Sequence, residues 1–245
     1  MLVFSGDWHG NFEKVIKKIK RLDLRDCIII QVGDFGVGFT TLIKESKTLN
    51  YFNITLKTRN IMLYVIRGNH DNPIYFNGGI NINKSNITLL PDYSVLNIDG
   101  LNILCVGGAI SVDRKPNPEV FNEYGKPHKG RKENVNYWID EKFVLKPELL
   151  KDLNNIDVVV THSCPHFCKP IFKDNIEKWV KYDNELTEDC DKERNDHSKL
   201  YNILKENSNP ISHWFHGHFH FSNTEYFNDT KFVLLNINEF YELRT

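Results

Sequence analysis

Short apolar segments that each end in a polar turn recur along this chain, and this pattern limits the folds open to it. Three of them lie in its first third, at residues 1–4, 27–32 and 61–66. A polar turn follows each of them, at residues 6–11, 33–36 and 67–71. Apolar residues at helical spacing lie between them, at 12–22 and 41–58. Alternating strands and helices of this kind predict the βαβαβ pattern of a mainly parallel sheet.

The remainder of the chain contributes further strands, of which a hairpin is the clearest. Residues 94–98 and 101–106 flank Asp99-Gly100, a dipeptide that favours a type I′ turn, so we expect an antiparallel pair attached to the parallel sheet. Other strands are expected at 87–90, 157–161, 211–215, 224–227 and 232–237. Residues 174–206 are polar and acidic, and we interpret them as a solvated face with a helix over 198–206.

Composition narrows the class of protein further. The formal net charge of −1 over 245 residues excludes strong attraction of the whole chain to nucleic acid or to a membrane surface. No apolar run approaches the roughly 18 residues that span a bilayer, and the N-terminus lacks the features of a signal peptide. The 5 cysteines form no even disulfide framework, which suits a reducing compartment. We therefore expect a cytoplasmic protein with one domain over residues 1–245.

Residues 111–143 differ in character from the remainder of the chain. Prolines and glycines interrupt any periodicity there, and basic residues cluster at 126–132. A long irregular connection inside a compact domain is usually either functional or disordered. Two interpretations stay open: a solvated loop, or a lid that brings positive charge to an anionic substrate.

Side chains that can bind metals stand at the ends of five predicted strands. In chain order they are Asp7 and His9, Asp34, Asn69 and His70, His162, and His218 and His220. Each alone has an ordinary explanation, such as a turn for Asp34 or a helix cap for Asn69. A parallel sheet, however, would bring them together at one edge. Carboxylate, amide and imidazole donors in this mixture suit manganese, iron or zinc, and their number favours two ions bridged by one carboxylate.

These residues lie in five motifs that resemble those of the calcineurin-like metallophosphoesterases. The motifs are G-D-x-H-G at 6–10, G-D at 33–34, G-N-H-D at 68–71, T-H at 161–162 and G-H-x-H at 217–220. They occur in the order of that family and span nearly the whole chain. The resemblance implies an α/β fold in which two mixed β-sheets pack together and are flanked by helices.

The resemblance also implies a role for each motif residue. One divalent cation would be bound by Asp7, His9 and His220 and a second by Asn69, His162 and His218, with Asp34 bridging the two. The two cations, with manganese favoured over iron and zinc, would activate a hydroxide that attacks phosphorus in line with the leaving oxygen. His70 would be the catalytic residue and, as an imidazolium, would protonate the leaving group or stabilise its charge. Asp71 is interpreted as structural.

The chain departs from the best-known members of this superfamily, the protein Ser/Thr phosphatases. They continue the second motif as G-D-x-x-D-R-G, whereas this chain reads GDFGVG at 33–38, without that aspartate partner for His70 and without that phosphate-binding arginine. The segment GGAISVDR at 107–114, with Trp138 and Glu141, resembles a less characterised prokaryotic-type branch. Arg114 and Asn11 are our candidates for substrate contacts.

The substrate class and the oligomeric state stay open at this point. A phosphomonoesterase and a phosphodiesterase would use the same ligands. Tyr137 and Trp138, beside the basic cluster, could hold a nucleic-acid strand by stacking, although the net charge does not favour it. A non-catalytic scaffold that binds proteins is a third interpretation, but neither a ligand nor His70 is missing. We expect a phosphoester hydrolase with a phosphorylated substrate and no membrane partner.

Overall fold

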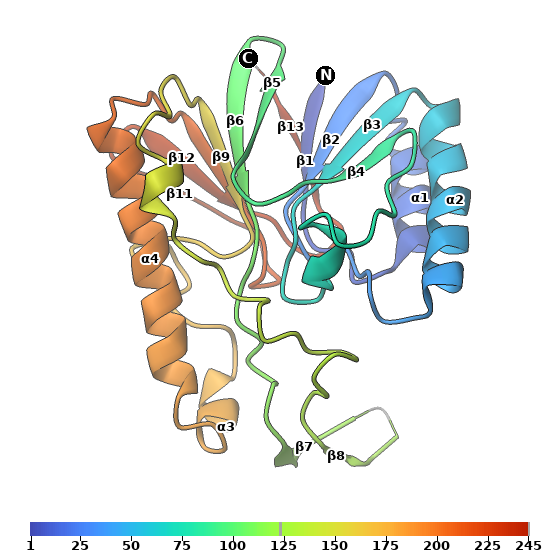
Figure 1. Cartoon of the computed structure of the whole chain (residues 1–245), viewed down its shortest axis with the longest axis vertical. Helices are drawn as coiled ribbons and strands as arrows, with labels where there is room; N and C mark the ends of the chain where they lie inside the picture. The colour runs from blue at the N-terminus through green and yellow to red at the C-terminus, as the bar shows by residue number, and fades with distance from the viewer. Residues whose placement is uncertain (123, 245) are drawn as a thin grey trace.

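The computed structural model describes residues 1–122 and 124–244. Two β-sheets pack against each other at the centre of the molecule, and helices cover their outer faces (Figure 1). Helices α1 and α2 lie on one side of this pair and helix α4 lies on the other. The predicted α/β architecture of two packed mixed sheets is confirmed.

The first sheet has the strand order β13-β1-β2-β3-β4. Its strands are β1 (Leu2–Ser5), β2 (Cys27–Gln31), β3 (Ile61–Val65), β4 (Ile87–Leu89) and β13 (Phe240–Leu243). Strands β1 to β4 are parallel, and β13 pairs antiparallel with β1. Helices α1 (Phe12–Arg21) and α2 (Leu42–Thr58) connect the first three strands, as the βαβαβ pattern predicted. Strand β13 was not predicted from the sequence.

The second sheet has the strand order β11-β12-β10-β9-β6-β5. Its strands are β5 (Ser94–Ile98), β6 (Leu101–Val106), β9 (Val158–Thr161), β10 (His213–His216), β11 (Asn223–Phe227) and β12 (Thr230–Leu234). The hairpin β5–β6 turns at Asp99 and Gly100, whose φ angles of 52° and 82° fit the predicted turn. The hairpin belongs to this sheet, not to the parallel one as we predicted. Strand β6 is apolar on both faces and pairs with β9, which is buried throughout.

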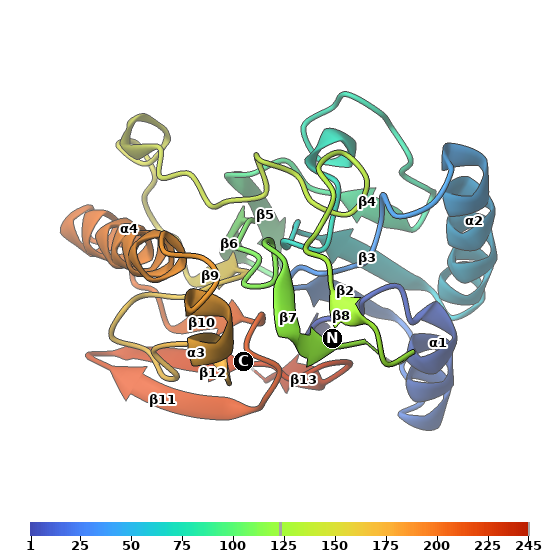
Figure 2. The same ribbon diagram turned by 90° about the horizontal axis from the view of Figure 1, so that it is seen from below.

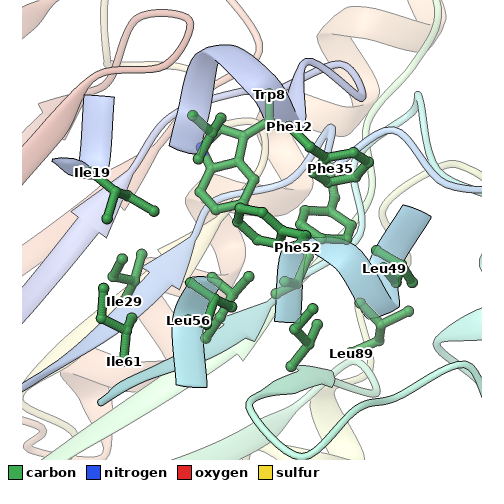
Figure 3. Close-up of a cluster of buried hydrophobic side chains, with 14 of the residues drawn as sticks. Trp8, Phe12, Ile19, Ile29, Phe35, Leu49, Phe52, Leu56, Ile61 and Leu89 are labelled. Atoms are coloured by element: carbon green, nitrogen blue, oxygen red, sulfur yellow. The ribbon is translucent and has the colours of Figure 1, made fainter. Parts of the chain in front are cut away.

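Apolar side chains fill three layers: one between the sheets, one beneath α1 and α2, and one beneath α4. In the layer between the sheets, Phe4 of β1 stacks on Phe215 of β10 with ring centroids 3.7 Å apart. Beneath α1 and α2, Trp8 packs against Phe35 and Phe52 (Figure 3). Because Trp8 and Phe35 each follow a predicted ligand, this layer anchors the turns that carry those ligands.

The acidic segment folds differently from our prediction. Helix α4 spans Leu186–Glu206 and therefore begins well before residue 198, and a short helix α3 (Ile176–Val180) precedes it. Asp183 and Glu193 are 1% and 7% exposed, so the segment is not a uniformly solvated face. For Asp183 the reason is a tertiary ion pair, because Arg114 donates to the carboxylates of Asp183 and Asp189 at 2.6 Å each.

The connection over residues 111–143 leaves the second sheet and extends past the ends of both sheets (Figures 1 and 2). It contains one short antiparallel pair, β7 (Asn117–Phe121) and β8 (Pro127–His128), which was not predicted, and is otherwise irregular. The amide of Asn117 donates to the carbonyl of Lys178 in α3 at 2.9 Å, which ties the connection to that helix. Among the helices of the described residues, none is long and apolar enough to cross a membrane.

Candidate metal centre

The predicted ligands meet where the carboxyl ends of strands from the two sheets converge. The first sheet supplies Asp7 and His9 after β1, Asp34 after β2, and Asn69 and His70 after β3. The second sheet supplies His162 after β9, and His218 and His220 after β10. The parallel pairing of β1, β2 and β3 and of β9 and β10 is what aligns these ends.

One group of donors consists of Asp7, His9, Asp34 and His220, whose ligand atoms all lie within 4.8 Å of one another. The Nε2 atom of His220 is 3.2 Å from Oδ2 of Asp7. The Nε2 atoms of His9 and His220 face each other at 3.1 Å. Converging imidazole and carboxylate atoms of this kind suit a borderline divalent cation.

A second group of donors shares Asp34 with the first and adds Asn69, His162 and His218. The Nε2 atom of His162 is 3.2 Å from both Oδ1 of Asp34 and Oδ1 of Asn69. The Nδ1 atom of His218 is 3.0 Å from Oδ1 of Asn69. The other ring nitrogen of His162 donates to the carbonyl of Val32 at 2.8 Å, which directs Nε2 toward Asp34 and Asn69, where a cation would replace its proton.

Asp34 lies between the two groups, and its carboxylate gives a direct test of whether they fit cations. Its Oδ1 atom accepts the backbone N–H of His70 at 2.7 Å. Its Oδ2 atom is buried and has no hydrogen-bond partner among the described residues, and lies 3.7 Å from Nδ1 of His9. Leaving a buried carboxylate oxygen unpaired is destabilising by roughly 1–3 kcal/mol or more. A divalent cation would remove that penalty, so the residues fit a pair of cations bridged by Asp34.

Asp34 and His162 each stabilise the charged form of the other. Burial alone would raise the pKa of Asp34, but the adjacent His162 and His70 hold it well below its usual range. Burial alone would lower the pKa of His162, but Asp34 outweighs this effect and raises it to about 9. Asp34 is therefore ionised at neutral pH, as a bridging ligand must be.

The backbone of the ligand turns is unusual. His9, Asp34, His218 and His220 have positive φ angles of 47°, 57°, 69° and 63°. Such conformations cost roughly 1–3 kcal/mol each for residues other than glycine, and they cluster at functional sites. A side chain at Gly68 would overlap the carboxylate of Asp34, which explains the glycine of the third motif.

Asp71 links the turns after β2 and β3 by hydrogen bonds to their backbones. Its two carboxylate oxygens accept backbone N–H groups from Phe35, Gly36, Val37 and Gly68 at 2.7–3.2 Å. Asn72, not Asp71, caps the short 3₁₀ helix that begins at Pro73. The contacts of Asp71 are with the backbone, consistent with the structural role that we predicted.

His70 contacts a cation from the 111–143 connection. Its Nε2 atom is 3.0 Å from Nη2 of Arg131, and the same guanidinium pairs with Asp113 at 2.7 Å. Burial, reinforced by Arg131 and opposed by Asp34, lowers the pKa of His70 to about 3. In this arrangement the neutral imidazole is therefore favoured. The role of His70 as an imidazolium toward the leaving group stays a prediction.

The two predicted substrate contacts differ in their surroundings. The side chain of Arg114 is 7% exposed and is paired with Asp183 and Asp189, while Arg131 reaches His70 instead. Asn11 is exposed at the first turn of α1, makes no side-chain capping bond and lines a surface groove, so its contact with substrate stays a prediction. Trp138 is 4% exposed, so its ring is not available as a stacking surface for a nucleic-acid strand.

Sequence reasoning missed the positions of Arg131 and Lys173. Arg131 was recognised only as one member of the basic cluster. Lys173 is half-buried and lines a small cavity together with the predicted ligand His218, and burial lowers its pKa. Nothing in the sequence around Lys173 marks it as a site residue.

Comparisons with known proteins agree with this geometry. The family described as calcineurin-like phosphoesterase matches residues 2–222. This chain belongs to that family. The family places it among the metal-dependent hydrolases of phosphoric ester bonds. A comparison with curated proteins gives no match.

One solved structure shows that the fold is shared over nearly the whole chain. The phosphopantetheinyl hydrolase of Mycobacterium tuberculosis is 14% identical, with a TM-score of 0.53, over 96% of this chain and 89% of that one. At this identity the likeness concerns the fold alone. An archaeal phosphodiesterase is 12% identical, with a TM-score of 0.41, over 96% of this chain and 83% of that one.

Proposed function

We propose that this member of the family hydrolyses its phosphoester with two divalent cations, one held by Asp7, His9, Asp34 and His220 and the other by Asp34, Asn69, His162 and His218. The observation that carries the proposal is the buried, unpartnered Oδ2 atom of Asp34 between two groups of convergent donors. Two cations at such a site lower the pKa of water and neutralise charge on the phosphoryl group during transfer.

A positively charged side chain of the protein completes this arrangement. Arg131 lies beside His70 at the metal centre, and we propose that it binds a phosphoryl oxygen of the substrate. A guanidinium that turns to the phosphoryl group no longer occupies Nε2 of His70. The freed nitrogen can then carry a proton to the leaving oxygen. In this proposal Arg131 replaces the phosphate-binding arginine that the second motif lacks, and the 111–143 connection acts as the lid.

Hydrolysis of two small chromogenic esters tests this function. Bis(p-nitrophenyl) phosphate and p-nitrophenyl phosphate are incubated with protein that has been stripped by a chelator and reloaded with manganese. The Asp34→Asn variant is measured alongside. Asp99→Asn is the matched control, because it makes the same change in the hairpin turn at the far end of β6, where asparagine suits the type I′ geometry.

We expect turnover by the wild type and by Asp99→Asn. In Asp34→Asn we expect turnover to fall by on the order of 10³-fold or more, with fewer bound cations. Preference for the diester or the monoester then identifies the class of substrate. Turnover that survives in Asp34→Asn, or a wild type that binds two cations and cleaves neither ester, would count against the proposal. A wild type that binds no metal would favour a protein-binding scaffold.

A further inference from the structure

A groove leads from the metal centre along helices α1 and α2. Its inner part has a volume of about 390 Å³ and begins at His9 and His70. Its outer part has a volume of about 570 Å³ and continues to Tyr51 on α2. Three residues line both parts: Gly10, Phe12 and Thr48. The two parts therefore adjoin each other, and together they extend from His9 and His70 to the exposed surface of α2.

Lysine side chains line both parts of this groove. Lys44 lines the inner part, and Lys14 and Lys47 line the outer part, all three with exposed side chains. Of the carboxylates along it, Glu13 is exposed, but Glu45 is buried and already accepts bonds from the backbone N–H groups of Gly38 and Thr40. In a chain with a net charge of −1, this is a local concentration of cations. Several separate anionic groups along one ligand would fit it.

Exposed aromatic rings lie in the same groove. Phe39 in the inner part is 39% exposed, and Tyr51 in the outer part is 66% exposed. Trp138 of the 111–143 connection holds the Phe39 ring edge-on, with centroids 5.2 Å apart. Aromatic faces that alternate with lysines are the features by which proteins bind a single nucleic-acid strand without reading its sequence.

We propose that this groove binds single-stranded nucleic acid, so that one phosphodiester lies at the metal centre and the phosphates of neighbouring nucleotides lie beside the three lysines. Water adds to phosphorus, the P–O bond to one sugar breaks, and that sugar oxygen takes a proton. The products are two shorter strands, one of which ends in a phosphomonoester. A phosphopeptide offers a single phosphate and leaves the outer lysines without a counter-charge. The inference rests on the proposed function, since it names the substrate of the same site.

The test compares strands of increasing length with a small diester. Dye-labelled thymidine oligonucleotides of two, four, eight and twelve nucleotides are cleaved by the manganese-loaded protein, beside bis(p-nitrophenyl) phosphate. The groove variant is Lys14→Ala, Lys44→Ala and Lys47→Ala combined. The control variant is Lys17→Ala, Lys20→Ala and Lys57→Ala, which removes three exposed charges from the same helices outside the groove.

For the wild type we expect kcat/KM to rise with strand length and to exceed that for the small diester. In the groove variant, the ratio of kcat/KM for the longest strand to kcat/KM for the small diester should fall on the order of tenfold. The slope of log Kd against log salt should also fall by about 2, because each of the three lost phosphate contacts lowers that slope by about 0.7. The Kd is measured by fluorescence anisotropy on the manganese-loaded protein with a phosphorothioate-linked strand, which resists cleavage, so binding is assessed without turnover. The control variant should match the wild type.

The possible failures are distinguishable. If the wild type cleaves neither p-nitrophenyl ester, the proposed function fails. If it cleaves the monoester but not the small diester, the function stands and the nucleic-acid proposal is overturned. If it cleaves the small diester but length brings no gain, or if the groove and control variants behave alike, the nucleic-acid proposal is overturned and the function stands. Stronger binding of a duplex or of a phosphopeptide than of the single strand would also overturn it.

Discussion

The guanidinium of Arg131 lies 3.0 Å from Nε2 of His70, although the two residues are 61 positions apart in the chain. The contact joins the irregular 111–143 connection to the turn after β3. Asp113, near the start of the same connection, accepts hydrogen bonds from Nε and Nη2 of the same guanidinium. The connection therefore has a defined position over the metal centre, and its basic residues are not equivalent to one another.

Replacing Arg131 should separate substrate binding from metal binding. We expect Arg131→Ala to lower kcat/KM by about 10²-fold, because a charge-bearing donor to the transferred group is lost. Arg131→Lys should recover part of that loss, and the number of bound cations, measured by mass spectrometry of the metals, should not change. Arg25→Ala, an exposed arginine that pairs with Asp23, is the control. Full activity in Arg131→Ala would show that the connection is only a solvated loop.

Replacing His70 should have an effect that depends on the leaving group. Proton transfer to the leaving oxygen contributes roughly 10²–10⁴-fold where that oxygen is strongly basic, and little where it is not. We therefore expect His70→Ala to lose far more activity on an alkyl phosphoester than on a p-nitrophenyl ester, with its cations retained. Equal losses on both esters would assign His70 to positioning instead of proton transfer.

Asp71→Asn should destabilise the fold and weaken metal binding together. The carboxylate accepts four backbone N–H groups from the turns that follow β2 and β3, and an amide nitrogen would face those donors. We expect the free energy of unfolding in urea to fall by roughly 2–4 kcal/mol. Cation affinity, measured by titration calorimetry, should fall as well. Asp99→Asn should leave both quantities unchanged.

Glu141 should make the stability of the protein depend on pH. Its Oε1 atom accepts the backbone N–H of Ser111 at 2.7 Å, Oε2 has no partner among the described residues, and burial raises its pKa to about 8. Between its ordinary pKa of about 4.5 and 8, the unfolded chain releases this proton while the folded chain keeps it. Stability is therefore full below that range and falls as pH rises, by up to about 1.4 kcal/mol per pH unit.

The Glu141→Gln variant isolates this effect. Urea unfolding at pH 6, 7.5 and 9 in the presence of a chelator should show wild-type stability falling with pH more steeply than that of the variant. The two curves should differ most at pH 9. Parallel curves would mean that Glu141 is ionised in the folded protein at neutral pH.

Most of the framework could be predicted because it depends on local signals. Apolar runs that each end in a polar turn predicted β1, β2 and β3 of the first sheet, and Asp99-Gly100 predicted the hairpin of the second. The ligands could be predicted because motif spacing and parallel pairing together place them at one edge. The cytoplasmic location, the preference for manganese and the single-domain organisation stay predictions.

The remaining features depend on partners that are distant in the sequence. The start of α4 could not be predicted because its acidic residues are stabilised by Arg114, some 70 positions earlier. Strand β13 has only short, half-exposed alternation and exists through its pairing with β1. Arg131 could not be distinguished from the basic residues around it, because only the path of the connection brings it to His70.

In the proposed centre, each cation site would take ligands from both sheets: Asp7, His9 and Asp34 with His220 in one, and Asp34 and Asn69 with His162 and His218 in the other. Neither sheet alone could complete either site. Cation binding would then stabilise the packing of the two sheets as well as the reaction site. In that case a chelator would weaken the contact between the sheets in addition to stopping hydrolysis.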